Sequence, residues 1–366
     1  MKRIAWAACV AALLAVAAGP AAAQQLHPIE VKAGDAFRHR HTKLELPATV
    51  AGIARTQVAE IEEDQLDVVV DYSAPDLSAA YTFYVYRNVS GALPVWFDRA
   101  RWMIEHRGAL GVPALPGRVE AFVPPARREA AALIATYDVS GKDFRSTGVA
   151  LLPLGEWYVK LRASSKNLSA AELEAKMKTA LAELRWPRDL PAAPAAATVE
   201  RCTTALALGD DAKLLEGGDK AGASTLMNAI LGMAVVESAK KKGASAPVRM
   251  PVWCQDAAQA LQGGVYRADG ATDSYLFALS DAGRAVWVGP DQALSILAAE
   301  APAKADKASY IVKLLLLPRT LASRPYDRLP PPNQALAIVK EGHFASAVPT
   351  WGKAKGHIEI SSDALK

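Results

Sequence analysis

The chain has 366 residues, 51% of them hydrophobic, and its 42 basic residues slightly outnumber its 38 acidic residues for a formal charge of +4. The hydrophobic content is ample for sizeable cores, and the chain lacks the clear basic excess of nucleic-acid-binding proteins. We therefore expect no nucleic-acid partner. The length is enough for about two domains of ~150 residues each.

The first 23 residues have the three parts of an export signal. Met1-Lys2-Arg3 gives a positive start, residues 4–18 are apolar, and Ala21-Ala22-Ala23 has the small side chains that signal peptidase accepts. The apolar run is shorter than the ~20 residues that span a bilayer. We expect cleavage before Gln24 and a periplasmic or secreted protein of the Gram-negative envelope. We also expect no transmembrane segment after cleavage and no cofactor.

The following residues predict strands with helices at intervals. Stretches rich in β-branched and aromatic residues predict strands. They cover 66–72, 80–89, 118–123, 131–139, 146–152 and 156–163. Pro94 is typical of a helix start and Gly108 of a helix end, so a helix is predicted over 95–107.

A second helix is predicted after the last of these strands. Ser169 and Glu172 have the spacing of a capping box, in which each side chain bonds the main-chain N–H of the other residue. The apolar residues Leu173, Met177, Leu181 and Leu184 then form one stripe, which predicts a helix lying on a sheet.

A Pro/Ala-rich stretch at 187–198 predicts a linker between an N-terminal domain, 24–186, and a C-terminal domain, 199–366. In the second domain we predict helices from Ser224 or Thr225 to Lys242 and over 333–340. A hairpin of 275–279 with 285–288 and strands at 310–317 and 357–360 complete it. The predicted fold class is α+β, with two domains that are each an antiparallel or mixed sheet covered by helices.

Two cysteines remain after cleavage of the signal, which contains Cys9. In an oxidising compartment, Cys202 and Cys254 predict a disulfide, and two buried free thiols are the alternative. Two cysteines are too few for a structural zinc site, and no metal site is predicted.

Known catalytic motifs are not matched. Residues 238–241 read S-x-x-K without the companion motifs, and the glycine-rich residues 217–225 lack the Gly-Lys-Ser/Thr order of a phosphate loop. Residues 269–273 predict a turn rather than a calcium loop. The catalytic residues, if there are any, stay unassigned.

His39 and His41 lie in a strongly basic segment, 37–43. We predict a solvated edge strand here. A metal site with two imidazoles on one strand face and a patch for an anion or a partner are the alternatives.

The aromatic residues of the first domain are the best candidates for recognition. Tyr84, Tyr86, Trp96 and Trp102 fall on a predicted strand and the helix after it. Aromatic groups with polar tips are favoured at binding surfaces, so these four are the predicted ligand or partner residues. Packing between helix and sheet is the alternative.

The order YTFYVYR, VWFDRA, WYVKLRASS and ELEAKMKTALAELRWP resembles a group of uncharacterised exported proteins of Gram-negative bacteria, over residues 44–187. The resemblance implies no activity and no site residues. We expect an exported soluble protein that acts as a non-catalytic binding or interaction module for an unknown protein or small-molecule partner. An extracytoplasmic hydrolase that uses carboxylates, and a structural role at the outer membrane, are the alternatives.

Overall fold

The computed structural model describes residues 26–107, 111–141, 143–215, 227, 230, 251–259, 264–291, 309–352 and 357–361. The predicted export signal lies outside these residues, and so do the S-x-x-K sequence and the glycine-rich stretch at 217–225. The predicted helix up to Lys242 also lies outside them, apart from Met227 and Ile230.

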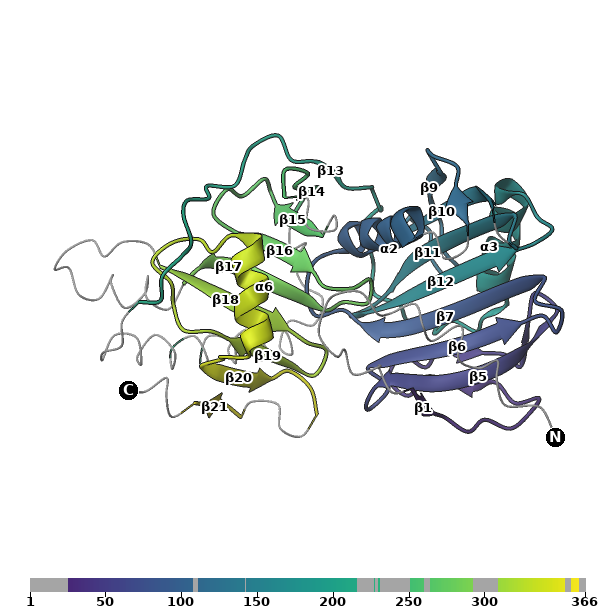
Figure 1. Cartoon of the computed structure of the whole chain (residues 1–366). Helices are drawn as coiled ribbons and strands as arrows, with labels where there is room; N and C mark the ends of the chain where they lie inside the picture. The colour runs from purple at the N-terminus through teal and green to yellow at the C-terminus, as the bar shows by residue number, and fades with distance from the viewer. Residues whose placement is uncertain are drawn as a thin grey trace, which may run out of the picture. The chain divides into compact units, whose positions relative to one another are not determined.

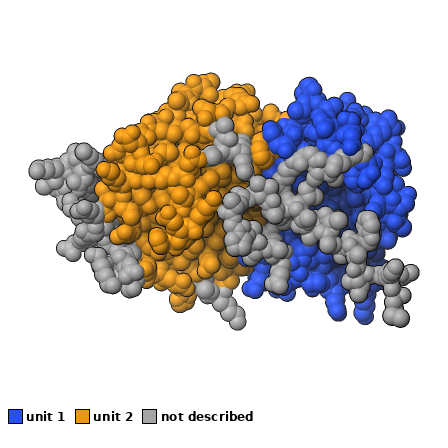
Figure 2. Space-filling model, viewed as in Figure 1, with its two compact units in different colours: residues 1–86, 103–195 blue, residues 87–102, 196–366 orange. Residues whose placement is uncertain are grey.

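The chain divides into two compact units (Figure 2). Unit 1 comprises Met1–Tyr86 and Met103–Ala195, and unit 2 comprises Arg87–Trp102 and Ala196–Lys366. The change of unit after Ala195 falls inside the stretch predicted as a linker. Residues 87–102, however, belong to unit 2, although the N-terminal domain was predicted to be continuous.

Unit 1 is built on a ten-stranded sheet (Figure 1). The strands run in the order β1-β5-β6-β7-β12-β11-β10-β8, with β4 on β5 and β9 on β10, while β2 and β3 form a separate pair. Their bounds are β1 His27–Pro28, β2 Phe37–Arg38, β3 Glu45–Leu46, β4 Thr49–Val50, β5 Ile53–Glu62, β6 Asp67–Ser73, β7 Ala79–Arg87, β8 Val112–Pro113, β9 Arg118–Phe122, β10 Ala132–Ser140, β11 Ser146–Leu154 and β12 Trp157–Ser165.

Helix α3, Ala170–Glu183, packs on β10, β11 and β12. The predicted capping box is present: Glu172 N donates to Ser169 Oγ at 3.4 Å, and Ser169 N donates to Glu172 Oε2 at 2.8 Å. The predicted apolar stripe faces the sheet, and its four residues are buried. The helix comes close to the strands at Gly148, where a Cβ atom would lie 3.0 Å from Met177 Sδ. A side chain at this position would push α3 away from the sheet.

Unit 2 contains a nine-stranded sheet whose strands follow the order of the chain from β13 to β21. Among the described strand pairings of this sheet, that of β13 with β14 is parallel and the others are antiparallel. Helix α6, Pro332–Glu341, packs on β17 and β18 and ends at Gly342, whose φ of 72° places it in the left-handed region that favours glycine (Figure 1). The strands are β13 Glu200–Arg201, β14 Trp253–Gln255, β15 Val265–Ala268, β16 Tyr275–Ala278, β17 Ala285–Pro290, β18 Tyr310–Leu315, β19 Arg319–Ala322, β20 Ser346–Pro349 and β21 Glu359–Ile360.

Helix α2 covers Leu93–Arg107, so residues 93–102 belong to unit 2 and the following residues to unit 1. The core of unit 2 gathers apolar residues from the sheet and from α6, together with Leu206 and Ala212. The strand residues of that core include Val265, Phe277 and Val288.

The structure corrects the predicted α+β class. Of the described residues, 39% lie in strands and 15% in helices, and three helices accompany large antiparallel sheets. The main omission was β5, a ten-residue strand. Its pairing with β6 has irregularities between Arg55 and Gln57 and between Glu60 and Glu62, and each shifts the alternation that marks a strand in sequence. Most neighbouring strands follow one another directly in the chain, as they do in antiparallel sheets. Most of the regular structure in the described residues is therefore strand.

Candidate functional site

The four aromatic residues predicted for recognition divide between the two units. Tyr84 and Tyr86 lie on β7 in unit 1, whereas Trp96 and Trp102 lie on α2 in unit 2. Tyr86 and Trp96 are fully buried, while Tyr84 and Trp102 are half-buried. The indole N–H of Trp96 donates to Ser90 O at 2.8 Å. Their role in binding stays a prediction, and burial favours packing for Tyr86 and Trp96.

A buried lysine joins the two tyrosines of unit 1. Lys160, on β12, is only 2% exposed, and its Nζ lies 4.3 Å from the centre of the Tyr84 ring and 5.7 Å from that of Tyr86. The ring of Tyr86 also meets that of Tyr158 edge to face, with 5.8 Å between centres. The faces of aromatic rings attract a cation, so the two tyrosine rings contribute to stabilising the buried Lys160.

An arginine has the corresponding place beside Trp102 in unit 2. The guanidinium of Arg99 lies 4.4 Å from the centre of the Trp102 ring, and Arg99 is 3% exposed. Burial lowers the pKa of Arg99, while the negative charges of Asp281 and Asp98 oppose that shift. Asp98 also accepts a hydrogen bond of 2.8 Å from the hydroxyl of Tyr266. Burial and this carboxylate raise the pKa of Tyr266, so the phenol stays protonated as the donor.

The segment around His39 differs from the predicted edge strand, because strand β2 ends at Arg38 and the following residues form a turn. His39 is fully buried, and its ring meets that of Trp157 edge to face with 4.9 Å between centres. Its Nε2 lies 2.9 Å from Gln65 O, which only accepts, so Nε2 carries the proton. Its Nδ1 then accepts from Thr42 N at 3.2 Å. Both ring nitrogens are therefore used inside the fold.

The pKa of His39 falls from 6.5 to about 4. Burial is the largest cause, the bond to Gln65 opposes it, and the positive charges of His41, Lys43 and Arg40 lower the pKa further. The imidazole is therefore neutral near neutral pH.

His41 holds the same turn against the connection between β5 and β6. Its ring stacks on Trp157 with 5.5 Å between centres and 11° between planes, and its Nε2 donates to Asp64 O at 2.7 Å. Arg40 adds an ion pair of 2.6 Å to Asp64. Asp64 and Gln65 both have a φ of 56°, which is unusual for residues other than glycine. We call His39, His41, Asp64, Gln65 and Trp157 the His39 cluster.

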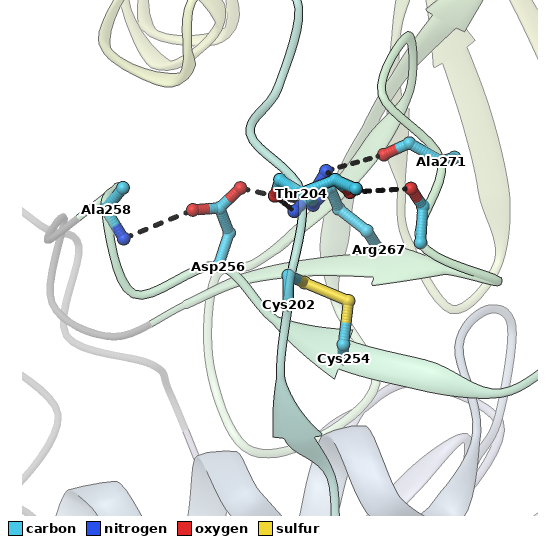
Figure 3. The surroundings of a disulfide bond; sticks show 8 residues. Cys202, Thr204, Cys254, Asp256, Ala258, Arg267 and Ala271 are labelled. Carbon is cyan, nitrogen blue, oxygen red and sulfur yellow. Dashed lines mark hydrogen bonds and ion pairs between the residues drawn. A yellow bond between two sulfur atoms is a disulfide. The ribbon is translucent and has the colours of Figure 1, made fainter.

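The two cysteines predicted to pair meet in unit 2 (Figure 3). The sulfur atoms of Cys202 and Cys254 lie 2.02 Å apart, at disulfide distance. Cys254 lies on β14, and the N–H of Cys202 donates to the carbonyl of Gln255 at 2.9 Å. The covalent bond and the main-chain bond thus fix the segment after β13 to β14. This pair is compatible with an extracytoplasmic location.

A buried arginine lies beside this pair (Figure 3). The side chain of Arg267 is 0% exposed, and its Nε lies 3.1 Å from Asp256 Oδ2. Its terminal nitrogens donate to the carbonyl of Ala271 at 2.9 Å and to that of Thr204. Because Cys254 and Arg267 are opposite each other on β14 and β15, the disulfide and the arginine hold the same segment. We call Cys202, Cys254, Thr204, Asp256 and Arg267 the Arg267 cluster.

A groove runs along the outer edge of β5 in unit 1, and we call it the β5 groove. Its volume is about 550 Å³, within the range of ligand sites. It is lined by Pro28, Ile29, Glu30, Val31, Lys32, Ala33, Arg55, Thr56, Gln57 and Val58.

The two walls of the β5 groove are fixed at its ends. Ile29 N donates to Val58 O at 2.9 Å, and the guanidinium of Arg55 donates to Asp35 O at 2.9 Å. On this edge, β4 pairs with β5 up to Ala54 and β1 pairs from Ala59 onward. Arg55 N also donates to Ala48 O at 2.8 Å, so the stretch of this edge without a strand partner is short and comprises the exposed residues Thr56 and Gln57.

None of the sequence predictions located the β5 groove or the partners of His39 and Arg267. The turn predicted at 269–273 is confirmed, with positive φ at Asp269 and Gly270. Within the described ranges, no three His, Cys, Asp or Glu side chains gather closely enough to hold a metal ion. In the same part of the chain, no helix has both the length and the apolar character needed to cross a membrane.

Comparison with protein-family models, with curated proteins and with solved structures finds no match for this chain.

Proposed function

We propose that this chain is an exported, non-catalytic protein that binds an extended segment of a partner protein in the β5 groove. The observation that carries the proposal is the groove itself. Its walls are an extended N-terminal arm and the edge of a strand, and such edges recognise peptides through main-chain hydrogen bonds. The basic residues Lys32 and Arg55 and the acidic residue Glu30 line the groove and supply polar contacts for selectivity.

The chemistry of the lining favours binding over catalysis. Glu30 is the one carboxylate among the ten lining residues. The one hydroxyl group of the lining, that of Thr56, donates to Asp71 O at 3.1 Å. A nucleophile within reach of a base is the arrangement that covalent catalysis needs, and these ten residues do not form one.

The polar clusters described above have structural partners. Tyr266 bonds Asp98, and Arg267 pairs with Asp256 while bonding two carbonyl groups. Arg267 Nε and Asp256 Oδ2 are paired by charge and make no hydrogen bond, so Arg267 is held by this ion pair and by the two carbonyl groups. These clusters lie in unit 2, so the binding proposal rests on the groove of unit 1 alone.

Site-specific photo-crosslinking tests the proposal in cells that produce the full chain. A photoreactive phenylalanine analogue at Gln57 is expected to form an adduct of one discrete mass with a partner. The same analogue at Leu77, a residue of unit 1 that is 52% exposed, is the matched control and is expected to give none. Equal adducts at both positions, or none at Gln57, would contradict binding in the groove.

The compartment is tested separately by fractionation and thiol alkylation. We expect an extracytoplasmic protein that begins at Gln24, with Cys202 and Cys254 unreactive until a reductant is added. A cytoplasmic protein with its first 23 residues intact and reactive thiols would refute export, whatever the crosslinking shows.

A further inference from the structure

Strand β9 lies on the edge of the unit 1 sheet that is remote from the β5 groove (Figure 1). It pairs with β10 on one side, and no other strand of the described chain pairs with it. The outer edge of β9 therefore presents main-chain N–H and C=O groups that a further strand can bond. Such an edge is a template for pairing with another chain.

Exposed apolar side chains lie at both ends of this edge. Leu115, before β9, is 61% exposed, and Val123, directly after it, is 52% exposed. Large apolar side chains with this exposure are few in the described chain, and Val112 in the neighbouring β8 is 67% exposed. Their grouping along one sheet edge indicates an interaction surface.

The strand carries charges of opposite sign two residues apart. Arg118 and Glu120 point to the same sheet face, where Arg118 Nε lies 3.4 Å from Glu174 of α3 and Glu120 pairs with Lys178 of α3. These contacts leave the side chain of Arg118 59% exposed and that of Glu120 44% exposed. Both charges therefore remain available to a second strand.

We infer that a second copy of this chain pairs with β9 in antiparallel orientation, about a two-fold axis through Val119. In this register Arg118 lies opposite Glu120 of the second copy, and Glu120 lies opposite Arg118 of that copy. The end of β9 that carries Val123 also meets the segment of the second copy that carries Leu115. Opposite charges on directly opposed residues stabilise an antiparallel pair, so the edge is complementary to itself.

Other registers lack this complementarity. An axis through Glu120 sets Glu120 against itself, and an axis through Arg118 sets two guanidinium groups against each other, and both arrangements are destabilising. A two-fold axis perpendicular to the sheet keeps α3 of both copies on the same face. The dimer uses the edge away from the β5 groove and does not depend on the function proposed for that groove.

Sedimentation velocity of the full mature chain with its disulfide intact tests the dimer. We expect the wild-type protein to pass from monomer to dimer as its concentration rises. The single variants Arg118→Glu and Glu120→Arg each set like charges opposite each other twice. We expect each of them to raise the dissociation constant by about tenfold or more.

Mixing the two variants provides the decisive measurement. An equimolar mixture of Arg118→Glu and Glu120→Arg has opposite charges at both positions, so we expect a heterodimer to form at wild-type concentrations. Contacts with α3 are altered in each variant and are not repaired by mixing, which separates the interface from a fold defect. The exposed α3 variant Lys176→Glu is the charge control and is expected to dimerise like the wild type.

Three results would overturn the inference. A wild-type chain that stays monomeric at all attainable concentrations would show that the charges of β9 only protect the edge. Unchanged dimerisation of both single variants would place the interface elsewhere. A mixture that stays monomeric would refute the register through Val119.

Discussion

The His39 cluster of unit 1 and the Arg267 cluster of unit 2 fix a chain segment to a pair of strands by opposite means. In unit 1 the central group is a neutral imidazole that donates to the carbonyl of Gln65 at 2.9 Å. In unit 2 the central group is a buried guanidinium with a carboxylate 3.1 Å away, beside a disulfide. Both central side chains have no exposed surface.

The difference shows how a buried polar group limits the conditions in which a fold is stable. A neutral histidine requires no counter-charge, but the fold loses stability when the ring is protonated. A buried arginine stays charged at all ordinary pH values, so it requires a carboxylate that stays ionised. Unit 1 should therefore respond to acid through His39, and unit 2 should respond to loss of Asp256 or to reduction.

The largest effect is expected from Asp256→Ala. The substitution leaves the charge of Arg267 buried without its carboxylate, which typically destabilises a protein by about 3–5 kcal/mol. Urea unfolding measures the loss, and hydrogen exchange in β14 and β15 assigns it to unit 2. The double variant Asp256→Ala/Arg267→Met removes the buried charge and should regain much of the stability. A loss below about 1 kcal/mol, the range of a surface pair, would show that Arg267 is solvated.

Removal of the disulfide should have the next largest effect. Cys202 and Cys254 are 52 residues apart, and closing a loop of this size stabilises a fold by about 2–4 kcal/mol. The double variant Cys202→Ala/Cys254→Ala should lose this amount in unit 2, and hydrogen exchange of β5 and β6 in unit 1 should not change. Adding a reductant should destabilise the wild type and leave the variant unaffected. Equal loss in both units would show that the two units unfold together.

Strands and helices with regular patterns could be predicted from the sequence, whereas contacts between remote segments could not. The capping box at Ser169 and the hairpin of β16 with β17 depend on neighbouring residues, and both are present. Strand β5 was missed because its irregular pairing hides the alternation. The fold class was wrong for the same reason, since strands without a regular pattern were not counted.

The sites were harder to find because their partners are far apart in the chain. His39 meets Gln65 and Trp157, and nothing near His39 in the sequence signals either contact. A basic segment suggests a solvated surface, yet the histidine inside it is buried. Arg267 and Asp256 are closer to each other in the sequence. An arginine within the apolar strand VYRA could have indicated a buried charge that needs a carboxylate partner.

The smallest of the three effects is the loss of stability that His39 causes in acid. Its pKa is 6.5 in the unfolded chain and about 4 in the fold, so the unfolded chain binds the proton more readily between these values. The stabilisation is therefore complete above pH 6.5 and is lost as the pH falls toward 4. Between pH 6.5 and pH 4, protonation of the unfolded chain should lower the stability of unit 1 by about 2–3 kcal/mol.

His39→Gln isolates this contribution, because glutamine can donate to Gln65 O and does not titrate. The variant should show a smaller fall in unfolding free energy between pH 6.5 and pH 4 than the wild type. Burial raises the pKa of Asp71, which acts in the opposite direction, so the difference between variant and wild type is the quantity to compare. His27→Gln, at an exposed histidine, is the control and should fall as the wild type does. Identical pH profiles for His39→Gln and the wild type would show that the ring of His39 is protonated as easily in the fold as in water.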